Sequence, residues 1–366
     1  MIYFMVPDSP APSGGIRFIY SMVDLLTAEG FEAAIWHGHR GFRCQWFDND
    51  SFVVNALRLA LNPGDIIIVP EVGGISHAHR LADARVVILN QNHFNTFNGA
   101  GFLHQSATYP GWPNAVAVIV TSTVIRDFVE RVLSVPLPVY AIPCAVSSEL
   151  FYPTPKEKIV AFMPRKRRQE AVTVVQLLLR SETLKGWKFT EIANRSEGDT
   201  ASILSKAAIF LSFSDREGFG LPPAEAMAAG CYVIGFNGHG GSEFMRPAFC
   251  SVIEDQNVLK FVAEIEKVAA TWDTDRAFVD AKTAEARAFI LDNYGRERMS
   301  RELLNAFARI TSPDSNARQT RTVEVQHYSY KSERARIREM IAQWIPPIAK
   351  VKASRPLDKA RGQGPK

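Results

Sequence analysis

Short apolar runs alternate with amphipathic stretches along the first 143 residues. The runs are four or five residues long and rich in β-branched side chains, which predicts strands that are buried on both faces. Two longer stretches, 16–29 and 123–133, have helical periodicity. Parallel strands covered by helices predict a Rossmann-like α/β domain. The predicted strands are 2–6, 33–36, 65–69, 85–89 and 116–120.

The same alternation restarts at residue 159, after a segment rich in Pro and Ser. The segment 144–158 has little periodicity, which predicts a linker. We therefore expect an α/β protein with two doubly wound, Rossmann-like domains, 1–143 and 159–310, that face each other across a cleft. Ligands of such sheets bind at the carboxyl ends of the strands. The second domain has predicted strands 159–163, 187–192, 207–213 and 231–236, and predicted helices 167–180, 200–206, 221–229, 256–270, 275–291 and 295–310.

The composition is that of a globular protein. The chain has 366 residues, of which 46% are hydrophobic and 22% charged, so a collagen-like or disordered chain is excluded. No run reaches the roughly 20 apolar residues of a membrane span, and the N-terminus lacks the basic start of a secretory signal. The four Cys residues have neither the density of a disulfide framework nor metal-ligand spacing. We therefore expect a reduced, cytoplasmic protein.

Residues 311–366 form a basic C-terminal extension with weaker patterning. An amphipathic stretch, 331–344, predicts a helix that Pro346 and Pro347 end. Residues 331–366 contain ten Lys and Arg and three acidic residues, a net charge of +7, whereas the net charge of residues 1–150 is −4. The end of the chain is polar, basic and contains Gly and Pro, so we expect about the last 15 residues to be disordered.

Two interpretations of this extension stay open. It could contact an anionic membrane through an apolar stripe, which would place the protein at the inner face of that membrane, or its helix could pack on the protein's own surface. We favour the second interpretation. The folded domains lack interleaved basic and aromatic residues, so no nucleic acid partner is expected. The stripe consists of Ile337, Ile341, Trp344 and Ile345.

The most informative segment is 214–236, SDREGFGLPPAEAMAAGCYVIGF, which follows a predicted strand. Gly218 and Gly220 permit a tight turn and the close approach of a ligand. The adjacent prolines suit the first turn of a helix, and a later glycine suits its end. The carboxylates of Glu217 and Glu225 lie on either side of the helix start. Free N–H groups there favour a phosphate, and carboxylates accept hydrogen bonds from sugar hydroxyls, so this segment suits a nucleoside diphosphate joined to a sugar.

This segment resembles the E-x7-E signature of retaining GT-B glycosyltransferases of the family 4 type. The resemblance implies that Glu217 contacts donor-sugar hydroxyls and is catalytic, and that Glu225 contacts the nucleotide ribose. It also implies two facing domains, with the acceptor on the N-terminal domain and the nucleotide sugar on the C-terminal one. The segment Gly218, Phe219, Gly220 and Leu221 would offer backbone contacts to the donor.

Cations for the diphosphate follow the strand 159–163 in the sequence PRKRR. In the family that it resembles, an Arg follows this strand and a Lys comes a few residues later. Arg165 fits the Arg position and would stabilise the leaving phosphate, but the residue five positions later is Glu170. The second phosphate contact is therefore open among three neighbouring cations, each of which could pair with phosphate. These are Lys166, Arg167 and Arg168.

The N-terminal domain offers further candidates by the same resemblance. Gly14 and Gly15 follow the first strand and correspond to a double-glycine loop that leaves room for the donor phosphate. His93 follows the strand 85–89, where relatives often place a His that faces the donor sugar. Two glycine-rich segments, 71–74 and 238–244, are candidates for an acceptor loop and a second donor loop.

Other sites are disfavoured. The pairs His37/His39 and His77/His79 lack a third metal ligand, and the segment 48–50, which resembles a D-x-D metal motif, lies outside a strand end. No G-x-G-x-x-G follows the first strand of either domain, which disfavours a dehydrogenase. We expect no metal or other cofactor, because the cations of the chain would replace the metal.

The resemblance implies hexosyl transfer from a nucleotide-sugar donor to a glycan or lipid-linked acceptor, with retention of anomeric configuration, as in polysaccharide biosynthesis. The leaving diphosphate would deprotonate the acceptor on the same face, while the protein positions both substrates. Two alternatives are a nucleotide-sugar epimerase of GT-B shape and a non-catalytic protein that binds nucleotide sugars. The sequence leaves the base, the sugar, the acceptor and the oligomeric state open.

Overall fold

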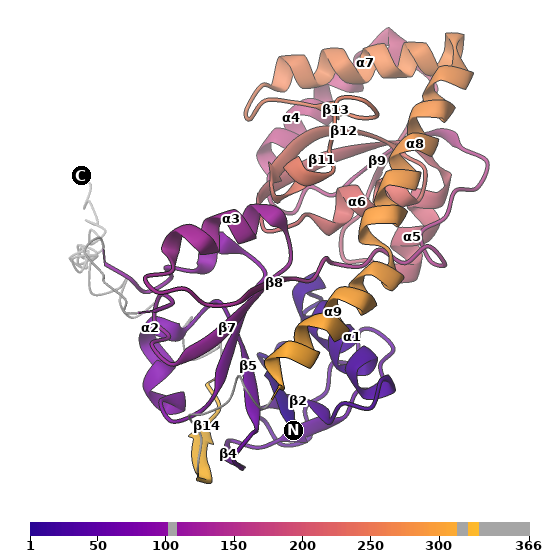
Figure 1. Ribbon diagram of the computed structural model, residues 1–366. Coiled ribbons are helices and arrows are strands. Elements are labelled where there is room, and N and C mark those ends of the chain that lie inside the picture. The colour runs from indigo at the N-terminus through magenta and orange to yellow at the C-terminus, as the bar shows by residue number, and fades with distance from the viewer. Residues whose placement is uncertain (102–107, 313–320, 329–366) are drawn as a thin grey trace, which may run out of the picture. The chain divides into compact units, whose positions relative to one another are not determined.

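The computed structural model describes residues 1–101, 108–312 and 321–328. Its first sheet has seven parallel strands in the order β3-β2-β1-β5-β6-β7-β8 (Figure 1). Since β1 lies inside the sheet and the chain winds outwards in both directions, the domain is doubly wound, as predicted. Its elements are β1 (Ile2–Met5), α1 (Gly14–Ala28), β2 (Ala33–His37), β3 (Val53–Asn55), β4 (Arg58–Leu61), β5 (Ile66–Pro70), α2 (Gly74–His77), η1 (Ala78–Leu81), β6 (Val86–Asn90), η2 (His93–Asn95), β7 (Ala115–Val120), α3 (Thr123–Val132) and β8 (Val139–Ala141).

The second sheet has five parallel strands in the order β10-β9-β11-β12-β13. It again places its first strand inside the sheet, which confirms a second Rossmann-like domain. The predicted linker 144–158 falls between β8 and β9, apart from its last two residues. The elements are β9 (Glu157–Phe162), α4 (Arg168–Leu178), η3 (Glu182–Leu184), β10 (Lys188–Glu191), α5 (Glu197–Lys206), β11 (Ala207–Glu217), α6 (Leu221–Ala228), β12 (Tyr232–His239), η4 (Gly240–Glu243), β13 (Ser251–Val252), α7 (Val258–Thr274), α8 (Arg276–Tyr294) and α9 (Arg296–Ile310).

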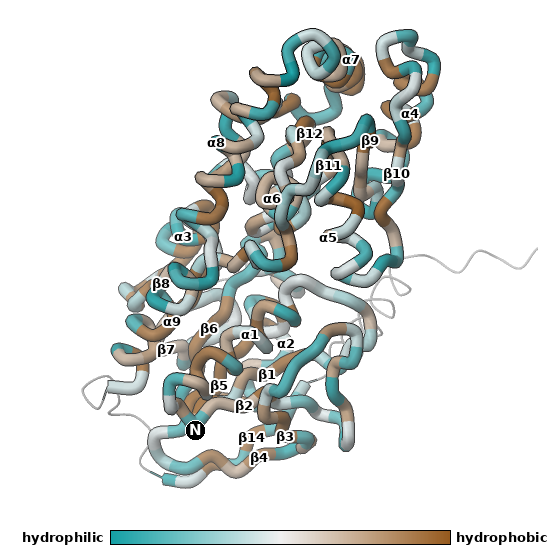
Figure 2. Tube along the Cα trace, turned by 90° about the vertical axis from the view of Figure 1, so that its right-hand side faces the viewer, coloured by the Kyte–Doolittle hydropathy of each residue, from teal (hydrophilic) through white to brown (hydrophobic). Residues whose placement is uncertain are grey.

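The inner strands of both sheets are buried on both faces, as their continuous apolar sequences predicted, whereas the edge strands β3, β8 and β10 are more exposed. In β5, Ile66 and Ile68 pack into one core cluster, whereas Ile67 and Val69 pack into another. Successive side chains of a strand point to opposite faces, so each face of the sheet needs its own covering layer of helices. Figure 2 shows the hydrophobic stretches in the strands of both sheets.

The last helix of the second domain packs on the first domain. The apolar face of α9 contacts α1 and β8, and the rings of Phe4 and Phe307 lie 5.9 Å apart. Arg85 donates a hydrogen bond of 3.1 Å to the carbonyl of Ile310 at the end of α9. Helix α9 therefore joins the cores of the two domains, which its sequence pattern alone did not indicate.

A short strand, β14 (Val323–Gln326), lies in the predicted C-terminal extension 311–366 and packs on the first domain, where no such strand was predicted. It pairs with β4 in an antiparallel two-stranded sheet. The following residues, His327 and Tyr328, are buried, and the Tyr328 hydroxyl donates a hydrogen bond of 3.1 Å to the carbonyl of Val72. The predicted helix 331–344, the disordered end and the apolar stripe lie outside the described residues. Among the helices that are described, none is long and apolar enough to cross a membrane.

Deleting residues 321–366 should lower the melting temperature of the protein more than deleting residues 329–366. The longer deletion removes β14 together with the buried side chains of Val325 and Tyr328, whose loss leaves cavities in the first domain. Differential scanning calorimetry of the two truncated chains measures the difference. Equal melting temperatures would show that β14 contributes nothing to the stability of that domain.

Candidate functional site

Glu217 lies at the carboxyl end of β11, the central strand of the second sheet. The structure extends this strand four residues beyond the predicted end at 213, because the polar residues after Phe213 keep pairing with β12 through a bulge. Glu217 is therefore the last residue of the strand, whereas the predicted strand 207–213 would have left it in the following loop. Gly220 has φ 98°, which favours glycine, and it caps the start of α6.

The turn after Glu217 lies directly against a loop of the first domain. A Cβ atom on Gly218 would lie 1.8 Å from the backbone oxygen of Gln91, so only glycine fits there. The Ser122 hydroxyl donates a hydrogen bond of 2.8 Å to the carbonyl of Gly218. Asn92 donates another of 3.0 Å to the carbonyl of Arg216. The carboxyl ends of strands from both sheets therefore meet at this turn.

One of the predicted phosphate contacts lies beside Glu217. The Lys166 ammonium is 2.7 Å from a carboxylate oxygen of Glu217 and donates a hydrogen bond of 2.9 Å to the carbonyl of Asp215. Both side chains of the pair remain partly exposed, at 30% for Lys166 and 22% for Glu217. A ligand can therefore reach this ion pair from solvent.

The other three cations differ in their exposure and in their ion-pair partners. Arg167 is buried over the ring of Phe236, and its guanidinium pairs with Asp215 at 3.0 Å and Asp255 at 2.8 Å. Arg168 is exposed and pairs with the carboxylate of Glu191 at 3.3 Å. Arg165 is also exposed, and it has neither a hydrogen bond nor an ion pair with any residue of the described ranges. Arg165 and Lys166 are thus the cations best placed to bind an added anion.

The second acid of the motif, Glu225, is buried within α6. Burial raises the pKa of its carboxyl group, and the positive charge and hydrogen bond of Arg17 oppose that increase. The Arg17 guanidinium lies 3.0 Å from a Glu225 oxygen and also pairs with Glu197 of α5. Sequence reasoning missed Arg17, although it is the only basic residue of α1 and follows the double glycine closely.

The double-glycine loop lies at the same place. A Cβ atom on Gly14 would lie 2.8 Å from the side chain of Leu221 at the start of α6. On Gly15, it would overlap the side-chain oxygen of Gln91, whose amide donates a hydrogen bond of 3.1 Å to the carbonyl of Gly15. The structure therefore brings Gly14 and Gly15 against the turn that carries Glu217 and Glu225.

His93 starts the short helix η2 and is buried. Its Nε2 atom lies 3.1 Å from Nδ1 of His239, which belongs to the second glycine-rich segment, 238–244. Burial and the proximity of His239 lower the pKa of His93 to about 4, so the imidazole is neutral at pH 7. A neutral imidazole can donate or accept a hydrogen bond without adding charge beside a donor sugar.

Two further acids position these loops, and they lie in the two glycine-rich segments, 71–74 and 238–244, that the sequence offered as candidate ligand loops. Glu71 accepts hydrogen bonds from the backbone N–H of Gln91 at 3.2 Å and the side chain of Asn95 at 3.3 Å, and burial raises its pKa. Glu243 accepts a hydrogen bond of 2.7 Å from the backbone N–H of Thr123 at the start of α3, and burial raises its pKa as well. Glu71 thus supports the loop that holds His93, and Glu243 ties the second glycine-rich segment to the first domain.

Histidines of the two disfavoured pairs contact other side chains of the protein. Asp8 accepts hydrogen bonds from His37, at 2.9 Å, and from His39, and these bonds outweigh burial and lower its pKa to about 2. The ring of His77 stacks on that of Tyr328 at 4.8 Å. Within the described residues there is no group of three or more His, Cys, Asp or Glu that could hold a metal ion.

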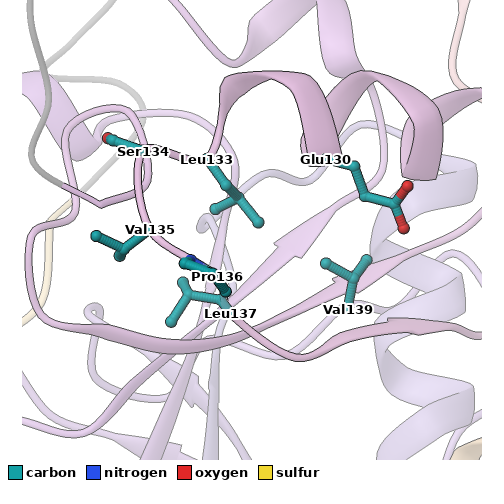
Figure 3. Close-up of a pocket in the computed structure, with 7 residues that line it drawn as sticks. All are labelled: Glu130, Leu133, Ser134, Val135, Pro136, Leu137 and Val139. Atoms are coloured by element: carbon teal, nitrogen blue, oxygen red, sulfur yellow. The ribbon is translucent and has the colours of Figure 1, made fainter.

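Figure 3 shows a surface pocket at the end of α3. None of the predicted donor-site residues lines this pocket, so it does not serve as the candidate site. Its lining residues are Glu130, Leu133, Ser134, Val135, Pro136, Leu137 and Val139.

Part of the chain is similar in sequence to known glycosyltransferases. Residues 175–284 match the model of the family described as Glycosyl transferases group 1, and this range includes Glu217 and Glu225. The chain is 34% identical over 182 residues to an alpha-1,6-glucosyltransferase of Actinobacillus pleuropneumoniae serotype 7 (strain AP76). That similarity covers 48% of this chain and 53% of the relative, so the chain spans about half the length of the curated relative that it matches.

Solved structures share the fold at low sequence identity. A glycosyltransferase from Rickettsia africae ESF-5 has a TM-score of 0.63 at 16% identity, covering 85% of this chain and 98% of that one. A sucrose-phosphate synthase from Thermosynechococcus elongatus has a TM-score of 0.59 at 14% identity, covering 84% and 98%. HepE of Anabaena, solved with UDP and glucose, has a TM-score of 0.56 at 12% identity, covering 84% and 99%. The chain therefore has the GT-B fold, and its residues 175–284 are similar to the family described as Glycosyl transferases group 1.

Proposed function

We propose that this protein is a retaining glycosyltransferase of the family 4 type, which transfers a sugar from a nucleotide-diphosphate donor to a glycan or lipid-linked acceptor. One observation carries the proposal. The acids of the E-x7-E motif, Glu217 and Glu225, lie at one strand–helix turn, with the ammonium of Lys166 2.7 Å from Glu217. The double-glycine loop of the other domain contacts the same turn through Leu221.

In this proposal different side chains bind the sugar, the ribose and the diphosphate of the donor. Glu217 accepts hydrogen bonds from the sugar hydroxyls, and Glu225 accepts them from the ribose. Arg165 and Lys166 bind the diphosphate, and the positive charge of both groups stabilises the leaving phosphate as the bond to the sugar breaks. When the donor binds, Lys166 exchanges its contact with Glu217 for a phosphate oxygen, which frees the carboxylate for the sugar.

The acceptor hydroxyl attacks the anomeric carbon from the face that the diphosphate leaves, and its proton passes to the leaving diphosphate oxygen. The neutral imidazole of His93 then supplies a hydrogen bond to the donor sugar rather than a charge. Because the cations of the chain neutralise the diphosphate, we propose that no metal is needed, so EDTA should leave the rate of transfer unchanged.

A donor screen tests the proposal. The name of the curated relative makes a glucose donor the first candidate, and HepE was solved with UDP, so UDP-glucose heads a panel that includes the GDP, ADP and dTDP sugars. We expect one donor to raise the melting temperature and to yield, with an acceptor, a product of unchanged anomeric configuration by NMR. A protein that converts the donor without an acceptor would be an epimerase, and one that binds the donor without converting it would be a binding protein.

The basic C-terminal extension, residues 311–366, could determine whether transfer takes place at a membrane, since its residues 331–366 have a net charge of +7. We propose that the protein acts in the cytoplasm and that the extension does not bind a membrane. Sedimentation with vesicles containing anionic lipid should then recover the full chain and a chain ending at Tyr330 to the same small extent. Sedimentation of the full chain alone would establish the membrane interpretation instead.

A further inference from the structure

Glu225 has one charged partner in the part of the chain that the structure describes. The guanidinium of Arg17 lies 3.0 Å from its carboxylate, and α1 brings this side chain from the other domain. The side chain of Glu225 is 10% exposed and that of Arg17 is 22% exposed. Arg287 of α8, which also packs on α6, donates its hydrogen bonds to the carbonyls of Ala228 and Phe151 and not to the Glu225 carboxylate.

Arg17 is shared between two acids. Its second partner is Glu197, the first residue of α5, whose side chain is 34% exposed. One guanidinium therefore pairs with two carboxylates, so the cluster of Arg17, Glu197 and Glu225 has a net charge of −1 when both acids are ionised. Nη1 of Arg17 pairs with Glu197 and Nη2 pairs with Glu225, so the two acids use different N–H groups but share the positive charge of one guanidinium.

We propose that Arg17 is a positioning residue that keeps the Glu225 carboxylate ionised and oriented for the nucleotide ribose, and that Glu197 weakens this effect by sharing the positive charge of Arg17. This inference rests on the proposed function. The first domain would then contribute to the ribose site through Arg17, which follows the double-glycine loop in α1.

The physical argument concerns the protonation of a buried acid. An ionised carboxylate accepts hydrogen bonds at both oxygens, whereas a protonated one must donate at one of them and so suits two ribose hydroxyls less well. Burial disfavours the charged form of Glu225, and Arg17 favours it. Removing Arg17 leaves the acid buried without a counter-charge, and removing Glu197 leaves Arg17 entirely to Glu225.

The test is isothermal titration calorimetry of UDP, GDP and ADP between pH 5 and 8, with whichever nucleotide the wild type binds. For Arg17→Ala we expect the affinity at pH 7 to fall at least about tenfold, since one partner of a buried charge pair is lost. We also expect its loss of affinity in acid to begin at higher pH than in the wild type. Glu197→Gln should shift that loss to lower pH, because the pKa of Glu225 falls when Arg17 serves it alone.

Arg17→Lys should restore part of the affinity, because an ammonium keeps the charge but lacks the planar fork. It also keeps the test valid if the alanine variant does not fold. Arg131→Ala, which removes an exposed arginine of α3, is the matched control and should reproduce the wild-type curve. If the wild type binds none of the nucleotides, the proposed function fails. If it binds one and the Arg17 and Glu197 variants all follow the wild-type curve, this inference fails while the proposed function stands.

Discussion

Replacing Arg165 by alanine should slow sugar transfer by about 100- to 1000-fold, the usual effect of removing one preorganised group that stabilises transition-state charge. Arg165 is exposed at the end of β9 and has no partner within the described residues, so the substitution breaks no contact that stabilises the fold. The lost interaction forms only with the diphosphate. Steady-state kinetics with the donor found in the screen should therefore show a lower kcat at an unchanged melting temperature.

Arg180→Ala is the matched control for this prediction. Arg180 is an exposed arginine just after α4 of the same domain, and its guanidinium contacts Gln176 and no predicted site residue. We expect its transfer rate to equal that of the wild type. Equal rates in the Arg165 and Arg180 variants would remove Arg165 from the proposed donor site.

Gly218→Ala should abolish most of the activity and also destabilise the protein, by about 1–3 kcal/mol in the free energy of unfolding. The added Cβ atom would lie 1.8 Å from the backbone oxygen of Gln91 and 3.0 Å from the Cα of Asn92. Both are backbone atoms, so the overlap cannot be relieved by a change of rotamer. The two loops must move apart, which displaces Glu217 from the loop that holds His93. Transfer assays and urea denaturation measure the two effects.

Gly198→Ala provides the opposite control. A Cβ atom on Gly198 meets nothing within 4 Å, and the residue lies within helix α5. Alanine should therefore leave activity unchanged and stabilise the protein by about 0.4–1 kcal/mol, because it restricts the unfolded chain. If Gly218→Ala behaved like Gly198→Ala, the close approach of the two loops would be wrong.

Much of the fold could be predicted because its signals are local. The continuous apolar runs of β1, β5 and β11 are buried on both faces, and this pattern indicates parallel strands under helices. The strand β14 escaped prediction, because its pairing with β4 joins residues more than 260 positions apart. The apolar runs of short, half-exposed strands such as β3 are too short for periodicity to identify them.

The candidate site divides in the same way. Glu217 and Glu225 lie in one continuous motif, so their spacing was readable from the sequence. The roles of Arg17, Glu71 and Glu243 depend on contacts between segments that are far apart in the chain, and these contacts exist only once both sheets have formed. The four adjacent cations could not be told apart by composition. Only the structure shows that Arg167 forms ion pairs with Asp215 and Asp255, whereas Lys166 lies beside Glu217.

A crystal structure of the protein with a bound nucleotide sugar tests the central claim most directly, through the distances from the ligand to the two acids and the two cations. We predict sugar hydroxyls within hydrogen-bond distance of Glu217, ribose hydroxyls within that distance of Glu225, and diphosphate oxygens on Arg165 and Lys166. A nucleotide sugar bound in the pocket of Figure 3, or anywhere else that leaves Glu217 and Glu225 untouched, would contradict the account.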